Sequence, residues 1–96
     1  IEFARALAAK PSLLMLDEPA GGLNREEVHH LEDLIRQVRD EFKVAVLLVE
    51  HHLNLVMKVS DRVIAMDFGQ KIADGLPHEV RSHPQVLEAY LGEEVA

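Results

Sequence analysis

The 96-residue chain fits one small domain, and its hydrophobic content of 48% is typical of a folded protein. The net charge of −7 and the scattered Lys and Arg residues argue against nucleic-acid binding, which needs a basic face. Without cysteine, the chain has no disulfide and no thiolate metal site. No apolar run approaches the ~20 residues that span a bilayer. Because the chain starts at Ile1 rather than Met and shows no signal peptide, we expect a processed or truncated piece.

The N-terminal residues predict a helix followed by a short strand. Residues 1–10 are rich in good helix formers, and Pro11 ends the predicted helix. Leu13–Leu16 is uniformly apolar and predicts a strand. Gly21 and Gly22 then indicate a loop.

A long amphipathic helix is predicted after this loop. Asn24 is a good N-cap, and Glu27 three residues later completes the pattern of a capping box. Apolar residues recur at spacings of three and four and predict a buried face, made of Val28, Leu31, Ile35, Val38 and Phe42. The rest of the helix carries charged residues, namely Glu26, Glu27, Glu32, Arg36 and Arg39.

Residues 44–49 are apolar at every position, which predicts a strand covered on both faces in a parallel sheet. Strand, helix and strand together form a βαβ unit, so the two strands should be parallel. Next we predict a short helix over His52–Val59 and two strands around a turn at Asp67–Gly69. Two closing helices are expected to start near Pro77 and Pro84, the second ending before Gly92. The whole is one α/β piece.

Polar residues follow both predicted parallel strands. Asp17 and Glu18 end the first strand, and Glu50, His51 and His52 end the second. Parallel strands end at the same edge of a sheet, where ligands of such sheets bind, so we expect these groups to share a site. Ionised carboxylates are costly out of water unless a positive charge lies against them, which suggests a function for the acidic pair.

An apolar strand followed by Asp-Glu is suited to phosphoryl transfer. The Asp can help hold Mg²⁺ on a nucleotide, the Glu can orient or deprotonate a water, and a nearby His can contact the γ-phosphate. The alternative is a solvated strand end without function. Pro19, the Gly-Gly loop and the histidine at the next strand end favour the functional interpretation.

These residues resemble a known family. Residues 13–24 (LLMLDEPAGGLN) resemble the Walker B and D-loop segment of ATP-binding cassette (ABC) ATPases, and residues 44–52 (VAVLLVEHH) resemble their next strand and switch-histidine loop. Residues 4–11 are similar to the helix that precedes Walker B, and residues 61–80 to a β-hairpin and helix of the family. The ending at 83–92 (HPQVLEAYLG) is similar to ATPase subunits of branched-chain amino-acid importers. The resemblance covers nearly the whole chain and implies a partial P-loop NTPase core, with parallel strands, flanking helices and a C-terminal hairpin.

The resemblance also implies roles for individual residues. Asp17 would reach Mg²⁺ directly or through water, Glu18 would be the general base, and His51 would contact the γ-phosphate. The D-loop, which crosses to the second subunit of a nucleotide-sandwich dimer, would be Gly22, Leu23 and Asn24, where Asn replaces the commoner Asp. His52 stands where relatives often carry Asp and receives no catalytic role.

Other motifs of the family are missing from the 96 residues. A Walker A loop, G-x-x-x-x-G-K-[ST], is absent because no lysine follows a glycine. The glutamine loop and the signature motif are also absent. We therefore expect residues 1–96 to be the C-terminal portion of a nucleotide-binding domain. Its parent would use ATP and Mg²⁺, while the isolated chain would be inactive and self-associating, since missing strands leave sheet edges bare.

The implied partners are a second ATPase subunit and transmembrane permease subunits, at the cytoplasmic face of the cell membrane, with no nucleic acid. One alternative is the half-head of a DNA-repair or chromosome-maintenance ATPase. Another is a non-catalytic or signalling α/β module. The histidine pairs at 29–30 and 51–52 could suggest a metal site. Neighbours on a helix diverge by ~100° and rarely share an ion, so we interpret His29 and His30 as solvated helix residues. Asp67–Gly69 (DFG) is interpreted as a hairpin turn rather than a kinase motif.

Overall fold

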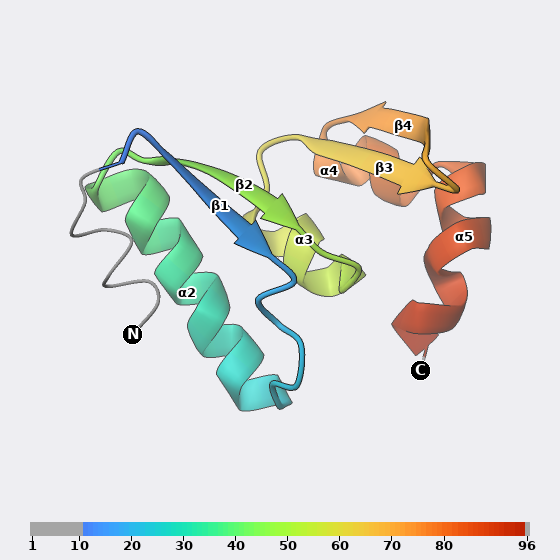
Figure 1. Ribbon diagram of the computed structural model, residues 1–96. Coiled ribbons are helices and arrows are strands. Elements are labelled where there is room, and N and C mark those ends of the chain that lie inside the picture. The colour runs from blue at the N-terminus through green and yellow to red at the C-terminus, as the bar shows by residue number, and fades with distance from the viewer. Residues whose placement is uncertain (1–10, 96) are drawn as a thin grey trace. The chain divides into compact units, whose positions relative to one another are not determined.

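The computed structural model describes residues 11–95, with side chains described to Tyr90 (Figure 1). The helix expected over residues 1–10 lies outside this part. The elements in chain order are β1 (Leu13–Asp17), α2 (Arg25–Glu41), β2 (Ala45–Val49), α3 (Leu53–Val59), β3 (Val63–Asp67), β4 (Gln70–Gly75), α4 (Pro77–Arg81) and α5 (Pro84–Val95). The chain divides into two compact units, Ile1–Val49 and Glu50–Ala96, and each is described by itself.

In the first unit, β1 and β2 form a parallel pair, as the βαβ pattern predicts (Figure 1). Their register runs from Leu13 opposite Ala45 to Asp17 opposite Val49. Both strands therefore end at the same edge of the sheet. Helix α2 connects them and packs against one face of the pair, where the core is made of Leu14, Val38 and Val44, with Leu16 and Val46 partly buried.

The face of α2 that the apolar spacing predicts is buried, with one exception. Val28, Leu31, Ile35 and Val38 are all buried, but Phe42 is 56% exposed, so its assignment to this face is wrong. The helix ends at Glu41 and Phe42 is its C-cap. Lys43 then adopts a left-handed φ of 56°, which turns the chain away from the helix axis.

Glu32 corrects a second expectation about α2. We expected this residue on the charged, solvated side, but it is buried, at 5% exposure. The reason is its spacing, since position 32 lies four residues after Val28 and one after Leu31, within the same buried stripe. Its carboxylate Oε1 lies 3.2 Å from the His29 Nδ1, and the His29 side chain is 56% exposed. His29 and His30 are both exposed, as predicted.

The second face of the β1–β2 pair is exposed, although we expected residues 44–49 to be covered on both sides. Burial alternates along β2, and Leu47 and Val49 are 49% and 48% exposed. Leu13 and Met15 of β1 are exposed in the same alternating way, at 55% and 62%. Side chains of a strand point alternately to its two faces, so these four belong to the face opposite α2. The uniformly apolar strand β2 is therefore packed on one face only.

The second unit begins with α3 and continues into an antiparallel hairpin of β3 and β4. The loop has two residues, Phe68 and Gly69, with φ values of 50° and 76°. Two consecutive positive φ values are typical of a type I′ turn, which matches the twist of a hairpin. The predicted turn at Asp67–Gly69 is confirmed. A bidentate pair from Arg62 to Asp74, with distances of 2.9 and 2.8 Å, joins the two strands at their other end.

Helices α4 and α5 complete the second unit. Its core contains Val63, Ala65, Val80 and Val86, so both helices pack against the hairpin. The hydroxyl of Tyr90 in α5 donates a hydrogen bond to the main-chain oxygen of Met66 in β3. Both helices begin at the predicted prolines, but α5 continues to Val95, so the expected end before Gly92 is wrong. Glycine weakens a helix by only about 1 kcal/mol, which a packed helix tolerates near its end.

Among residues 11–95, no helix combines the length and apolarity needed to cross a membrane.

The Arg62–Asp74 pair should make the hairpin sensitive to acid. The hydrogen bonds from Arg62, together with the charges of Arg62 and Lys71, hold the pKa of Asp74 below its ordinary value of 3.8. A lowered pKa stabilises the folded state at pH above the ordinary value, and this stabilisation is lost as pH falls through the lowered pKa. We predict that Asp74→Asn removes this acid-dependent loss, measured as the free energy of urea unfolding between neutral pH and pH ~3.

Asp40→Asn is the matched control. The pKa of Asp40 is also lowered, mainly by a hydrogen bond from Arg39, its immediate neighbour in the chain. Adjacent residues can pair in the unfolded chain too, so this variant should keep the acid dependence of the wild type. Identical acid dependence in Asp74→Asn and the wild type would contradict the prediction.

Candidate functional site

The acidic pair lies at the carboxyl end of β1, as predicted. Asp17 is the last residue of the strand and lies opposite Val49 in the register. The main-chain N–H of Glu18 donates a 2.7 Å hydrogen bond to the main-chain oxygen of Val49. The pairing of β1 with β2 therefore extends up to Glu18, so the backbone of both acidic residues is held at the sheet edge.

Both acidic side chains are exposed to solvent. Neither carboxylate is therefore buried, so the expected cost of removing an ionised carboxylate from water does not arise in the structure. The exposed position leaves the carboxylate oxygens of Asp17 and Glu18 accessible to a ligand. Oxygen ligands of this kind are those that Mg²⁺ prefers, and a carboxylate can also act as a general base on water.

Glu18 has a left-handed backbone, with φ of 49°. This conformation is uncommon for residues other than glycine and costs of the order of 1 kcal/mol or more. It starts a turn in which the N–H of Gly21 donates to the Glu18 main-chain oxygen at 3.2 Å. Strained residues held by surrounding hydrogen bonds concentrate at functional sites. The chain thus bends sharply at the residue that we expect to act on water.

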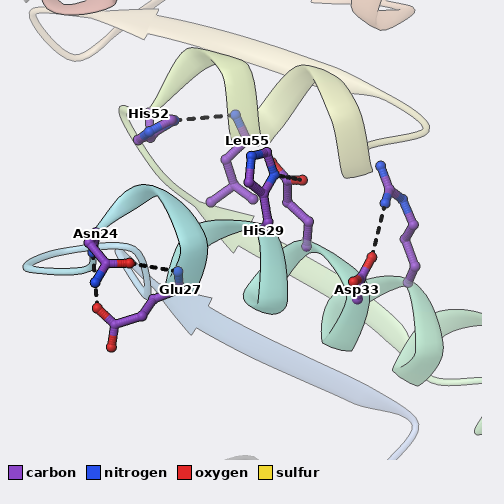
Figure 2. Close-up of polar contacts among 8 residues, drawn as sticks. Asn24, Glu27, His29, Asp33, His52 and Leu55 are labelled. Atoms are coloured by element: carbon purple, nitrogen blue, oxygen red, sulfur yellow. Dashed lines mark hydrogen bonds and ion pairs between the residues drawn. The ribbon is translucent and has the colours of Figure 1, made fainter.

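The loop after the acidic pair ends in a fully formed helix cap. Gly22 has φ of 79°, a left-handed value that favours glycine, and Leu23 is half-buried. The Asn24 Oδ1 accepts a 2.8 Å hydrogen bond from the Glu27 N–H, and the Glu27 Oε1 accepts one of 3.0 Å from the Asn24 N–H. Figure 2 shows this reciprocal pair at the start of α2. The predicted capping box is confirmed, and it fixes where the proposed D-loop meets the helix.

The histidine segment belongs to the second unit. His51 follows Val49 by two residues, and its side chain is 58% exposed. His52 is the N-cap of α3, since its Nδ1 accepts a 3.3 Å hydrogen bond from the Leu55 N–H (Figure 2). This hydrogen bond gives His52 a structural role that its position in the sequence did not reveal.

Glu50 is the residue that sequence reasoning missed most clearly. Its side chain is 1% exposed, and its Oε1 accepts a 3.1 Å hydrogen bond from the His51 main-chain N–H. A glutamate after a strand carries no periodicity signal that would predict burial, so the sequence offered no way to find it. Within residues 11–90, no three or more His, Asp or Glu side chains gather closely enough to hold a metal ion on their own.

Comparisons with known proteins find similarity to ATP-binding proteins of ABC transporters. A family described as branched-chain amino acid ATP-binding cassette transporter matches residues 70–96. The chain is 47% identical, over 93 residues, to the high-affinity branched-chain amino acid transport ATP-binding protein BraF of Pseudomonas aeruginosa, with 97% of this chain and 36% of BraF covered. It is 46% identical to the zinc import ATP-binding protein ZnuC of Alkalilimnicola ehrlichii, covering 97% of this chain and 37% of ZnuC.

The fold is similar to that of a solved ATP-binding cassette. The crystal structure of MJ1267 in its ADP conformation, an ATP-binding cassette of an ABC transporter, superposes with a TM-score of 0.82 and 30% identity. It covers 95% of this chain and 37% of MJ1267. The 96 residues therefore span little more than a third of the length of the relatives that they match.

The capping box should contribute measurably to stability. Replacing Asn24 by Ala removes the acceptor for the Glu27 N–H, and loss of such a cap costs about 1 kcal/mol. We predict this decrease in the free energy of urea unfolding for Asn24→Ala. Asn24→Asp keeps a side-chain oxygen at the helix start and should remain within a few tenths of a kcal/mol of the wild type. An alanine variant as stable as the aspartate variant would show that the cap does not contribute.

Proposed function

We propose that this chain, which is similar in sequence and fold to ATP-binding proteins of ABC transporters, is the C-terminal part of such a subunit and supplies its hydrolytic residues. The observation that carries the proposal is the position of Asp17 and Glu18. Both lie exposed at the carboxyl end of β1, in parallel register with β2, where open α/β sheets bind ligands. The parent protein would couple ATP hydrolysis to import.

Asp17 is the residue that would hold Mg²⁺, directly or through water. Its carboxylate is exposed at the strand end, and carboxylate oxygens suit this ion, so the residues present fit it. Bound Mg²⁺ would supply charge neutralisation on the β- and γ-phosphates of ATP. The family also provides a phosphate-binding Walker A loop, which none of these 96 residues forms.

Glu18 would orient the attacking water and accept its proton. Its left-handed backbone lies in a turn that main-chain hydrogen bonds to Val49 and Gly21 hold in place. His51, exposed after β2, would contact the γ-phosphate and that water. Gly22, Leu23 and Asn24 would form the D-loop of a nucleotide-sandwich dimer, with the capping box of Asn24 setting its final direction.

The transported substrate is proposed to be a branched-chain amino acid. Overall identity does not separate the candidates, because BraF and ZnuC are 47% and 46% identical to the chain. Residues 70–96 match a family described as branched-chain amino acid ATP-binding cassette transporter, which favours the branched-chain type. These residues include the hairpin strand β4 and the closing helices α4 and α5. The partners would be a second ATPase subunit and transmembrane permease subunits, and the protein would then act at the cytoplasmic face of the membrane.

The role of Glu18 can be tested in the full-length subunit assembled with its permease. We predict that Glu18→Gln reduces the rate of ATP hydrolysis by roughly 10²-fold or more, the range for a missing general base. Gln keeps the size and the backbone of the residue, so ATP binding should persist. Phosphate release and equilibrium binding of radiolabelled ATP measure the two quantities separately.

Glu41→Gln is the control for this variant. Glu41 is exposed at the end of α2, so the same chemical change there should leave hydrolysis unchanged. Near-normal hydrolysis by Glu18→Gln would remove Glu18 from the catalytic role.

The isolated 96-residue chain should not bind ATP usefully, because it lacks the Walker A loop that would cradle the phosphates. We predict a flat titration by calorimetry with Mg-ATP, and a micromolar site would contradict this.

The exposed apolar face of β1 and β2 should also drive self-association. Light scattering on the same sample should therefore report species above the monomer mass of 10.8 kDa.

A further inference from the structure

Glu50 and His51 form a contrasting pair at the start of the second unit. They are adjacent in the chain, yet the Glu50 side chain is 1% exposed and the His51 side chain is 58% exposed. A buried carboxylate needs hydrogen-bond donors or positive charge, because removing it from water costs several kcal/mol otherwise. What the Glu50 carboxylate contacts therefore indicates its purpose.

Two contacts of this carboxylate lead to His51. The Glu50 Oε1 accepts the 3.1 Å hydrogen bond from the His51 main-chain N–H, which fixes the backbone that carries the imidazole. The same oxygen lies 3.9 Å from the His51 Nδ1. This distance exceeds a hydrogen bond, but a charge in a poorly solvated position still acts strongly over it.

The position of the carboxylate distinguishes the two ring nitrogens. A proton on Nδ1 is attracted by the nearby negative charge, whereas an Nδ1 lone pair is repelled by it. The hydrogen bond or charge beside one ring nitrogen sets which nitrogen carries the proton. We propose that Glu50 is a positioning residue that keeps the proton of His51 on Nδ1, so that Nε2 carries the lone pair that acts on the ligand.

The consequence for the reaction rests on the proposed function. With Nδ1 protonated, Nε2 is the nitrogen that accepts a hydrogen bond from the attacking water or, once protonated, donates one to a phosphate oxygen. Glu18 remains the proposed general base, and Glu50 would set which nitrogen of His51 meets the water or the phosphate. Glu50 would contribute to the reaction through His51 rather than by contacting the nucleotide.

The tautomer can be measured without any activity. In the full-length subunit at alkaline pH, ¹⁵N chemical shifts report which ring nitrogen of each histidine carries a proton, and His51→Gln identifies the His51 signals by their loss. We expect the Nδ1–H form of His51 to predominate in the wild type. In Glu50→Gln, whose amide oxygen can still accept from the His51 N–H, the signals should move towards the Nε2–H form. A predominant Nε2–H form in the wild type overturns the proposal, even if the variant fails to fold.

Hydrolysis by the assembled transporter gives the second readout. For Glu50→Gln we expect kcat to fall roughly ten- to a hundredfold, with KM for ATP unchanged. This is the range seen when a residue that orients a metal-bound histidine is replaced. Glu88→Gln, at an exposed position of α5, is the control that should match the wild type. An unchanged kcat in Glu50→Gln overturns the positioning role.

Two further variants keep the proposals distinguishable. If Glu18→Gln and His51→Ala both hydrolyse ATP normally, the proposed function fails, while the tautomer measurement still decides the structural role of Glu50. If both variants are inactive and Glu50→Gln behaves like the wild type in spectrum and rate, only the inference about Glu50 fails.

Discussion

The hydrogen bond from the Glu18 N–H to the Val49 oxygen, at 2.7 Å, closes the parallel pairing on which the candidate site depends. It continues a register of five residue pairs that ends with Asp17 opposite Val49. Side chains alternate along a strand, so a slip by one residue would send Leu14 out of the core and move Asp17 to the other face. The burial of Leu14 against Val38 of α2 prevents that slip. Core packing at one end of β1 therefore decides where the carboxylates stand at the other.

The segment between β1 and α2 is constrained at both ends by hydrogen bonds that main-chain N–H groups donate. At its start, Glu18 is paired to β2 and bent into a left-handed turn. At its end, Asn24 and Glu27 satisfy each other's N–H groups, which a helix start otherwise leaves unpaired. A short loop fixed in this way loses little entropy when a second subunit or a ligand contacts it, which suits a segment proposed to cross between subunits.

Local patterns were sufficient to predict most of the fold. The capping box, the βαβ unit and the hairpin turn at Asp67–Gly69 each follow from patterns within or between neighbouring elements, and all three are confirmed. The errors concern what surrounds an element. Phe42 continues the apolar spacing but lies beyond the helix end, and Glu32 lies on the buried stripe despite its charge. Residues 44–49 are apolar throughout, yet the cover of a strand depends on distant parts of a chain, which a local pattern cannot specify.

The two glutamates at the strand ends show why the site itself was only half predictable. Glu18 is exposed with a strained backbone, whereas Glu50 has a buried side chain bonded to its neighbour's N–H. An exposed carboxylate is stabilised by water and can exchange that water for a ligand. A buried carboxylate is hydrogen-bonded to protein groups in place of water, so its negative charge acts on those groups. Glu18 could be identified from the sequence because it lies in a motif that resembles the Walker B segment of ABC ATPases. Glu50 could not, because no local sequence pattern indicates that its side chain is buried. The two proposed roles follow from this difference in solvation: an exposed Glu18 would meet a ligand, and a buried Glu50 would position His51.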